Sequence, residues 1–306
     1  MTKLLSICIP TYNGGENLKY NINKLINISL KYNFDICVSD NASTDNTQEY
    51  MLNLISKHDF IKYHRNDENM GFAYNFDYVL KMSDTEYAWL LGDDDEIYEE
   101  CVERLYNCLL VYKPDICVVN AKKNATKIVD LKSKLYTDKN EVMKDLGRYM
   151  SWISCLIFNR DILDNVGINK IKDNAFPHLL GIFNFLNNRC KLYWFSYPCI
   201  DNQTILQERY SDKVLNYFVK DWFNITKRAV NYNKKVKKIF CNKLWTKLNF
   251  KTIIIWRINN AINLKKMWEI RTIFFYLPLK LRFILILSIC FPIKFLKICY
   301  FIYKNN

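Results

Sequence analysis

Three short polar segments hold the side chains that are best suited to chemistry. Pro10–Asn13, Ser39–Asp45 and Asp93–Asp95 each follow a short apolar run. The third segment is three consecutive carboxylates, which repel one another unless a hard divalent cation relieves the repulsion. Mg²⁺ and Mn²⁺ prefer carboxylate oxygens together with the phosphate oxygens of a substrate. The segments therefore predict a metal-assisted site for a substrate that contains a diphosphate.

Each segment also has an interpretation without chemistry. Pro10–Asn13 is typical of a turn into a helix, and Asp40–Asp45 would suit the N-cap region of one. Asp93–Asp95 would suit an exposed turn, but only Gly92 separates it from the apolar run Trp89–Leu91. This run places the carboxylates at the rim of the core, so the purely structural interpretation is weakest for the triplet.

The apolar pattern predicts strands that alternate with helices, which is typical of βαβ units and a parallel sheet. We expect strands at Leu4–Ile9, Asp35–Val38, Ile61–His64, Glu86–Leu91, Asp115–Val119, Trp152–Phe158 and Lys191–Tyr197, helices at Leu18–Leu30, Thr47–Lys57, Phe72–Met82, Glu99–Tyr112 and Phe176–Asn187, and a connecting loop at Lys122–Asn140. The fold class is α/β, with a Rossmann-like, mostly parallel sheet flanked by helices. The three polar segments follow strand ends, where open α/β sheets bind their ligands.

The charge is distributed unevenly along the chain. Of its 306 residues, 44 are Lys or Arg and 31 are Asp or Glu, and Thr226–Asn306 holds 18 of the basic residues against a single acid, Glu269. We expect an α/β domain over residues 1–210 and a basic, mainly helical extension over residues 211–306. The asymmetry predicts that the extension meets an anionic partner, either a membrane surface or a nucleic acid.

The end of this extension, Ile273–Lys304, is both apolar and basic. Its longest uncharged stretch is Phe283–Ile293, 11 residues, whereas a membrane-spanning helix needs about 20 apolar residues. Pro278 and Pro292 interrupt the helical pattern. We expect one or two amphipathic helices in an anionic membrane interface, with a buried basic subdomain as the alternative. Nucleic acid is not an expected partner, because the basic residues lie among Leu, Ile and Phe.

The eleven cysteines show no spacing typical of a zinc site, and Cys8, Cys37, Cys117 and Cys155 lie within apolar runs. They predict buried free thiols in a reducing compartment. The N-terminal residues lack the apolar core and the cleavage site of a signal peptide. We therefore expect a cytoplasmic protein that lies peripherally on the inner face of the cytoplasmic membrane.

The ordered set of segments resembles the GT-A glycosyltransferases of family 2. The matching stretches are Ser6–Asn13, Val38–Asp45, Asn69–Gly71 with Asn75, and Leu90–Asp95. The triplet is similar to that of an abequosyltransferase-like branch of bacterial surface-polysaccharide enzymes. The resemblance covers about residues 4–200. It implies a GT-A fold and a transferase with a nucleotide-sugar donor, most commonly a UDP-sugar.

The resemblance implies a nucleotide site made of residues at matching positions. They are Pro10, Thr11, Tyr12, Asp40, Asn69, Gly71, Asp93 and Asp94. The first three would line the base pocket, and Asp40 would accept a hydrogen bond from the base or the ribose. Asn69 and Gly71 would lie beside the nucleotide, where a bulky residue at position 71 would block the approach of the backbone.

The resemblance also implies that the metal, Mn²⁺ or Mg²⁺, binds at the triplet. Asp95 would be its direct ligand, and Asp94 would face the ribose or the donor sugar. Three consecutive Asp residues align with a two-Asp motif in more than one register. Asp94 and Asp93 are therefore alternative ligands.

The position of the catalytic base departs from the family pattern. Inverting members place a Glu-Asp pair at the start of a helix, whereas this chain has Pro177 and His178 there. The positive end of the helix dipole would keep a histidine neutral, as a base requires. His178 is therefore one candidate for the base. Asp173 is the other, in which case His178 packs the helix or binds the acceptor.

These observations predict an inverting, metal-dependent glycosyltransferase. It would move a sugar from a nucleotide-sugar donor, such as a UDP-sugar, to a saccharide or glycolipid acceptor in bacterial surface-glycan synthesis, and the acceptor would be lipid-linked. A nucleotidyltransferase is disfavoured, because the chain has no Gly-rich phosphate loop. A non-catalytic, membrane-associated scaffold with a degenerate GT-A site is the alternative.

Overall fold

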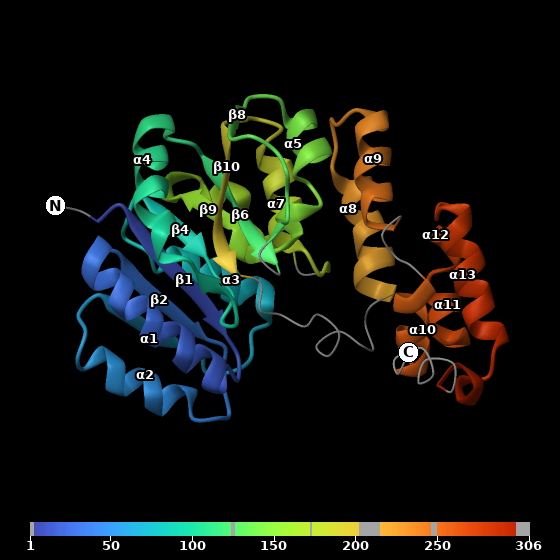
Figure 1. Cartoon of the computed structure of the whole chain (residues 1–306), viewed down its shortest axis with the longest axis horizontal. Helices are drawn as coiled ribbons and strands as arrows, with labels where there is room; N and C mark the ends of the chain where they lie inside the picture. The colour runs from blue at the N-terminus through green and yellow to red at the C-terminus, as the bar shows by residue number, and fades with distance from the viewer. Residues whose placement is uncertain (1–2, 124–125, 172, 202–214, 246–249, 298–306) are drawn as a thin grey trace. The chain divides into compact units, whose positions relative to one another are not determined.

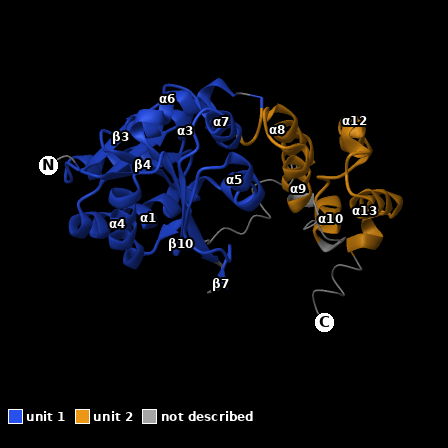
Figure 2. Ribbon diagram, turned by 90° about the horizontal axis from the view of Figure 1, so that it is seen from above, with its two compact units in different colours: residues 1–173, 177–204 blue, residues 174–176, 205–306 orange. Residues whose placement is uncertain are grey.

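The computed structural model describes residues 3–123, 126–171, 173–201, 215–245 and 250–297. The chain divides into two compact units, which are coloured separately in Figure 2. Unit 1 comprises residues 1–173 and 177–204, and unit 2 comprises residues 174–176 and 205–306. The predicted boundary between residues 210 and 211 lies outside the described residues.

Unit 1 is built around a mixed sheet. Its strands are β1 (Leu5–Thr11), β2 (Asp35–Asp40), β3 (Ile61–Arg65), β4 (Tyr87–Leu90), β5 (Glu96–Ile97), β6 (Ile116–Lys123), β7 (Thr126–Lys127), β8 (Lys134–Tyr136), β9 (Leu156–Asn159) and β10 (Leu192–Asp201). They follow the order β3-β2-β1-β4-β9-β6-β10-β5, with β7 paired to β6 and β8 to β10. The first four strands in this order are parallel, and β9 is antiparallel to both of its neighbours.

Helices cover both faces of this sheet. They are α1 (Gly15–Tyr32), α2 (Thr47–Ile55), α3 (Phe72–Lys81), α4 (Val102–Tyr112), α5 (Lys139–Asp145), α6 (Leu163–Val166) and α7 (Pro177–Phe185). Figure 2 shows α3, α6 and α7 over one face and α1 and α4 over the other, and Figure 1 shows α1 and α2 side by side. Because the sheet is covered on both faces, β1 and β4 are buried along their whole length, as continuous apolar runs predict.

Most of the predicted elements are present, and the differences have physical causes. β1 continues through Pro10 to Thr11, because its ladder with β4 ends at the Cys8–Leu90 pair and Pro10 keeps only β2 as a neighbour. The predicted strand at residues 152–158 begins with a 3₁₀ turn, Ile153–Cys155, before β9. The predicted loop at residues 122–140 contains the short strands β7 and β8.

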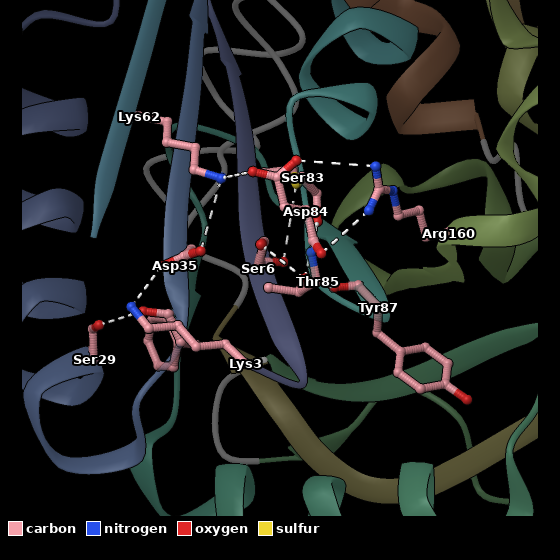
Figure 3. Close-up of polar contacts among 12 residues, drawn as sticks. Lys3, Ser6, Ser29, Asp35, Lys62, Ser83, Asp84, Thr85, Tyr87 and Arg160 are labelled. Carbon is pink, nitrogen blue, oxygen red and sulfur yellow. Dashed lines mark hydrogen bonds and ion pairs between the residues drawn. The ribbon is translucent and has the colours of Figure 1, made fainter. Parts of the chain in front are cut away.

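The amino ends of the parallel strands are closed by charged side chains (Figure 3). Lys3 Nζ lies 2.6 Å from Asp35 Oδ1, and Lys62 bridges Asp35 and Asp84. Arg160 donates to the backbone carbonyl oxygen of Asp84 at 3.3 Å. These contacts fix the starts of β2 and β4 and leave the opposite, carboxyl edge of the sheet to other side chains.

Unit 2 is helical. Its described residues contain a π-helical segment (Asn216–Asp221), α8 (Trp222–Arg228), α9 (Lys234–Trp245), α10 (Phe250–Ile258), α11 (Leu264–Glu269), α12 (Arg271–Phe274) and α13 (Leu279–Cys290). Residues 174–176 belong to it because the Asn174 side chain and the Ala175 backbone N–H donate to Asp221, each at 3.0 Å. Within the described residues, no helix is long and apolar enough to cross a membrane.

The cysteines of the described residues are all free thiols. Cys8, Cys37, Cys117 and Cys155 are fully buried, so the prediction made for these four is confirmed. Burial raises the pKa of Cys117 and Cys155, which keeps both thiols protonated and inert.

Gly181 on α7 packs so closely against α6 that a methyl group has no room. A Cβ atom built there would lie 2.5 Å from the carbonyl oxygen of Val166. We expect Gly181→Ala to lower the free energy of unfolding by about 1–3 kcal/mol, outweighing the gain of about 1 kcal/mol in helix propensity. Urea unfolding followed by circular dichroism measures the change. Asn184→Ala, at an exposed position of the same helix, is the control and should retain wild-type stability or exceed it. An equally stable Gly181→Ala protein would contradict this packing.

Candidate active site

The carboxyl ends of β1, β2 and β3 bring three polar side chains into one row. Thr11 pairs with Asp40, and Asp40 pairs with Arg65, in parallel register. Residues in register on neighbouring parallel strands point to the same face of the sheet, so these side chains lie next to one another. Thr11 and Asp40, both predicted for the nucleotide site, are thus brought together at the ligand-binding edge of the fold.

Asp40 is fully buried, and its neighbours fix the orientation of its carboxylate. Oδ1 accepts a hydrogen bond from the Ser43 backbone N–H, and Oδ2 accepts one from the Tyr63 hydroxyl, both at 2.8 Å. Arg65 Nε lies 3.7 Å from Oδ2. Burial and the Asp40 carboxylate raise the pKa of Tyr63, so its hydroxyl remains a donor. Asp40 is therefore an acceptor whose position is set before any ligand arrives.

The loops after β1 and β2 are tied to each other. The Asn13 backbone N–H donates to Ser43 Oγ at 2.8 Å, and the Thr44 backbone N–H donates to Asn13 Oδ1 at 2.7 Å. Pro10 is buried within β1, whereas the Tyr12 side chain is 49% exposed. An aromatic ring exposed beside the row offers a stacking surface to a planar group. The first two polar segments thus form one continuous surface.

A network of asparagine side chains holds the loop between β3 and α3 against this surface. Asn41 Oδ1 accepts a hydrogen bond from Asn66 Nδ2 at 3.0 Å, and Asn41 Nδ2 donates to Asn69 Oδ1 at 2.8 Å. From α3, Asn75 Nδ2 donates to the backbone carbonyl oxygen of Ser39 at 2.9 Å. The network anchors Asn69, predicted to lie beside the nucleotide, to the residue that follows Asp40.

Gly71 has a backbone conformation that favours glycine. Its φ is +82°, in the left-handed region, and its N–H donates to Asn69 Oδ1 at 3.0 Å. A Cβ atom built at Gly71 would meet no protein atom within 4 Å. The conformation at the start of α3, rather than crowding within the protein, therefore accounts for glycine here.

The first carboxylate of the triplet is bound to the row. The Thr11 hydroxyl donates to Asp93 Oδ2 at 2.8 Å, and Asn21 Nδ2 donates to the Asp93 backbone carbonyl oxygen at 2.7 Å. The chain passes so close at Gly14 that a Cβ atom there would lie 2.4 Å from Thr11 Oγ1. Thr11, which stands in register with Asp40 on β2, therefore links the row to Asp93.

The third carboxylate, Asp95, is bound by side chains of the segment that leads into β9. Asp95 is 3% exposed, and its Oδ2 accepts hydrogen bonds from Trp152 Nε1 at 2.8 Å and from Ser154 Oγ at 2.5 Å. The Ser154 hydroxyl also accepts a hydrogen bond from the Gly92 backbone N–H at 2.9 Å. Asp94, between the two anchored carboxylates, is half-buried and is the most exposed residue of the triplet.

The donor set of the triplet fits a hard divalent cation. Within the described residues, no group of three or more His, Cys, Asp and Glu side chains is placed to enclose a metal ion. Mg²⁺ needs no such cage, since it binds through one or two carboxylates together with waters and substrate phosphates. Asp94 and Asp95 offer carboxylate oxygens, and Trp152 and Ser154 orient Asp95 as donors commonly orient metal-binding carboxylates.

His178 lies in the core of unit 1. Its side chain is 2% exposed, and Nε2 donates to the carbonyl oxygen of Ser151 at 3.1 Å. Its ring meets that of Phe76 edge-on, with the ring centroids 6.1 Å apart. Burial lowers the pKa of His178 to about 4, so the ring is neutral. Burial is the main cause of this shift.

Asp173, the other candidate base, has an exposed side chain four residues before α7. The start of α7 is joined to the triplet through one short segment. Ser151 contacts His178, and the next residue, Trp152, contacts Asp95. The structure thus links His178 to the triplet through the chain at residues 151–154.

Several residues that build the site are not singled out by the sequence. They are Tyr63, Arg65, Asn66, Trp152 and Ser154. The first two lie at the carboxyl end of a predicted strand, and that position is the same signal that identifies Asp40. Trp152 and Ser154 carry no such signal, because their apolar surroundings predict the interior of a strand.

The fold and the site define an α/β transferase of the GT-A class. Residues 6–167, more than half of the chain, match the family described as Glycosyl transferase family 2. The chain therefore belongs to glycosyl transferase family 2 and is a glycosyltransferase, as the motifs predict.

Relatives in bacterial glycan synthesis match different shares of the chain. The abequosyltransferase RfbV of Salmonella typhimurium is 27% identical over 268 residues, 79% of this chain and 80% of its own. The poly(ribitol-phosphate) β-N-acetylglucosaminyltransferase TarP of Staphylococcus aureus is 34% identical over 110 residues, 34% of this chain and 32% of its own. The GalNAc(5)-diNAcBac-PP-undecaprenol β-1,3-glucosyltransferase of Campylobacter jejuni is 26% identical over 179 residues, 54% and 55% of the two chains.

Solved structures share the fold. The S. aureus TarS fragment 1–349 in complex with UDP-GlcNAc has a TM-score of 0.58 at 16% identity and covers 85% of this chain and 79% of its own. The mannosyltransferase PcManGT from Pyrobaculum calidifontis, in complex with GDP-Man and Mn²⁺, has a TM-score of 0.56 at 12% identity and covers 89% and 75%. At these identities the likeness concerns the fold alone, and it confirms the predicted fold class.

Burial of a neutral His178 makes stability depend on pH. Its pKa is about 4 in the folded protein and about 6.5 in an unfolded chain. The unfolded state therefore binds the proton more tightly, so this contribution is fully present above about pH 6.5 and is lost as the pH falls towards 4. Wild type should lose about 3 kcal/mol more stability between pH 7 and pH 4 than His178→Gln, which does not titrate. Urea unfolding at both pH values measures the difference, and equal losses would contradict the burial.

Proposed function

We propose that this glycosyltransferase is inverting and metal-dependent, and that it transfers a sugar from a UDP-sugar to a lipid-linked saccharide. One observation carries the proposal, the hydrogen bond from Thr11 to Asp93. It joins the row at the ends of β1 and β2, suited to a nucleoside, to a carboxylate triplet suited to a metal-bound diphosphate. The similar fold of structures holding UDP-GlcNAc, or GDP-Man with Mn²⁺, supports this assignment.

The nucleoside would bind along the row. Asp40, fixed by Ser43 and Tyr63, would accept a hydrogen bond from a base or ribose donor. Tyr12 would stack against the base, and Thr11 and Pro10 would form the floor beneath it. Asn69, Gly71 and Asp93 would lie beside the nucleotide, since the asparagine network and Thr11 connect these positions to Asp40.

Asp94 and Asp95 would hold the metal, Mn²⁺ or Mg²⁺. When bound, the metal offsets the charge that develops on the diphosphate leaving group. Asp95 Oδ2 already accepts two hydrogen bonds, whereas Asp94 is the more exposed carboxylate. We therefore assign the more direct contact to Asp94 and the role of buried anchor to Asp95, which reverses the order inferred from the motif.

The base must reach the acceptor hydroxyl, and this requirement favours Asp173. A general base lies within about 3 Å of the proton that it removes. His178 is buried and its Nε2 is engaged by Ser151, whereas the Asp173 carboxylate is exposed. Asp173 would take the proton from the acceptor hydroxyl, whose oxygen attacks the anomeric carbon. The bond to the diphosphate breaks, the configuration inverts, and the nucleoside diphosphate leaves.

The acceptor is inferred from the relatives. The C. jejuni relative is named for a pyrophosphoryl-undecaprenol-linked glycan and TarP for a poly(ribitol phosphate). The name of the C. jejuni relative supports a glycan acceptor built on a lipid carrier, which we infer to be used at the inner face of the cytoplasmic membrane. The 18 basic residues after position 225 would hold the chain at that anionic surface. Nucleic acid is not a partner in this proposal.

Thermal unfolding with nucleoside diphosphates and Mn²⁺ tests the donor site. At about 100 times its dissociation constant, a ligand stabilises the folded state by about 2.7 kcal/mol, so UDP with Mn²⁺ should raise the unfolding temperature. Asp94→Asn should remove the metal-dependent part of the increase. Asp84→Asn, at the opposite edge of the sheet, is the matched control and should retain it. No increase with any nucleotide and metal would favour the degenerate scaffold instead.

Initial rates of nucleoside diphosphate release in the presence of acceptor distinguish the two candidate bases. Asp173→Asn should lower kcat by about 10²–10⁴-fold, as expected for loss of a general base. His178→Gln keeps a donor for Ser151 and should lower kcat by less than about tenfold. A large loss in His178→Gln with little change in Asp173→Asn would move the base to His178.

A further inference from the structure

α13 has two apolar faces, and the structure buries only one of them. The buried face contacts α10 and consists of Leu281, Ile284, Leu285 and Ser288. Arg257 Nε, from α10, donates to the Ser288 backbone carbonyl oxygen at 3.2 Å. Helical spacing places Leu279, Phe283 and Ile286 on the opposite face, where they are 76%, 64% and 50% exposed. α13 is therefore apolar on two opposite sides.

Exposed apolar side chains continue along the neighbouring segments of unit 2. Leu264 and Trp268 on α11 are 74% and 67% exposed, and Phe275 and Tyr276, between α12 and α13, are 78% and 66% exposed. We call the exposed side of α13, which consists of Leu279, Phe283 and Ile286, the docking face; the other four residues are its exposed apolar neighbours in the sequence. Neighbouring exposed apolar side chains on a domain surface are typical of interaction sites, so the docking face is a candidate contact surface.

The charges around the docking face are almost all positive. On α13, Lys280 and Arg282 flank the exposed apolar stripe on either side. Arg271 lies over the Trp268 ring at 4.5 Å, and Lys265 and Lys294 are exposed nearby in the sequence. Long basic side chains lay their stems along apolar surface and extend the charge outward. A partner that meets this face therefore presents negative charge above an apolar layer.

We propose that the docking face lies in the headgroup region of an anionic lipid bilayer. Trp and Tyr rings prefer this region, and basic residues beside apolar ones anchor helices in the membrane plane. A protein partner would need acidic groups matched to each cation, whereas an anionic bilayer supplies them everywhere. The inference rests on the proposed function for its membrane setting and adds the residues that make the contact.

Flotation of the full-length protein with lipid vesicles tests whether the apolar side chains of the docking face contribute to membrane binding. Wild type should bind phosphatidylcholine vesicles that contain phosphatidylglycerol more tightly than pure phosphatidylcholine vesicles. Leu279→Ser/Phe283→Ser should weaken this binding by at least about tenfold. Leu110→Ser/Val111→Ser removes an exposed apolar pair from α4 in unit 1 and should bind as wild type does. All four side chains are exposed, so an unchanged unfolding temperature verifies that both variants fold.

A second variant tests the charges. Lys280→Gln/Lys294→Gln should weaken binding to the anionic vesicles by about fivefold for each lost charge. Lys57→Gln/Lys132→Gln, at exposed positions of unit 1, is the matched control and should have no effect.

Two results would overturn the proposal. One is unchanged vesicle binding of Leu279→Ser/Phe283→Ser. The other is a lipid-free dimer, seen by analytical ultracentrifugation, that this variant dissociates, since the face would then contact a second copy of the chain. Hydrolysis of the UDP-sugar in solution reports on the active site separately and should be equal in all variants. Vesicle binding by a wild-type protein that releases no UDP would refute the proposed function and support the docking face.

Discussion

The hydrogen bond from Thr11 to Asp93 is the contact on which the site depends. It joins the end of β1 to the turn after β4, and Thr11 stands in register with Asp40 on β2. The contact requires glycine at position 14, because a Cβ atom there would lie 2.4 Å from the Thr11 hydroxyl oxygen. Since β1 lies between β2 and β4, a slip in its register would displace Thr11 from Asp40 and from the triplet together.

Aspartate side chains have different partners at the amino and carboxyl edges of the sheet. At the amino edge, Asp35 and Asp84 pair with Lys and Arg side chains, which neutralise them and close the fold. At the carboxyl edge, the hydroxyl groups of Thr11 and Ser154 and the indole N–H of Trp152 donate hydrogen bonds to Asp93 and Asp95. Uncharged donors fix a carboxylate while leaving its charge available to a cation. Asp40 in the row differs from the triplet in this respect, because Arg65 Nε also lies 3.7 Å from its Oδ2.

The order of strands and helices and the three polar segments are predictable from the sequence, because strands buried on both faces are continuous apolar runs. Which strands lie next to one another in the sheet is not predictable from the sequence. β9 inserts between β4 and β6 in the antiparallel sense, and the segment that leads into it brings Trp152 to Asp95. The prediction for His178 is limited in the same way. The sequence predicts a helix start at this position, whereas the burial that lowers the pKa of His178 depends on the packing around α7. Tertiary contacts decide such features, and a single sequence does not specify them locally.

The apolar residues of α13 in unit 2 also differ in their tertiary surroundings, which the sequence alone does not reveal. Leu281 and Ile284 are accounted for by burial within the unit, whereas Leu279 and Phe283 remain exposed. A donor that is small and water-soluble gives no reason to keep such a face. A lipid-linked acceptor would explain the exposed apolar face. When enzyme and acceptor are confined to one surface, their effective concentration rises without any new contact at the active site. Under the proposed function, the exposed residues of α13 therefore serve encounter with the acceptor rather than the chemical step, and the basic charge of the extension follows from the same requirement.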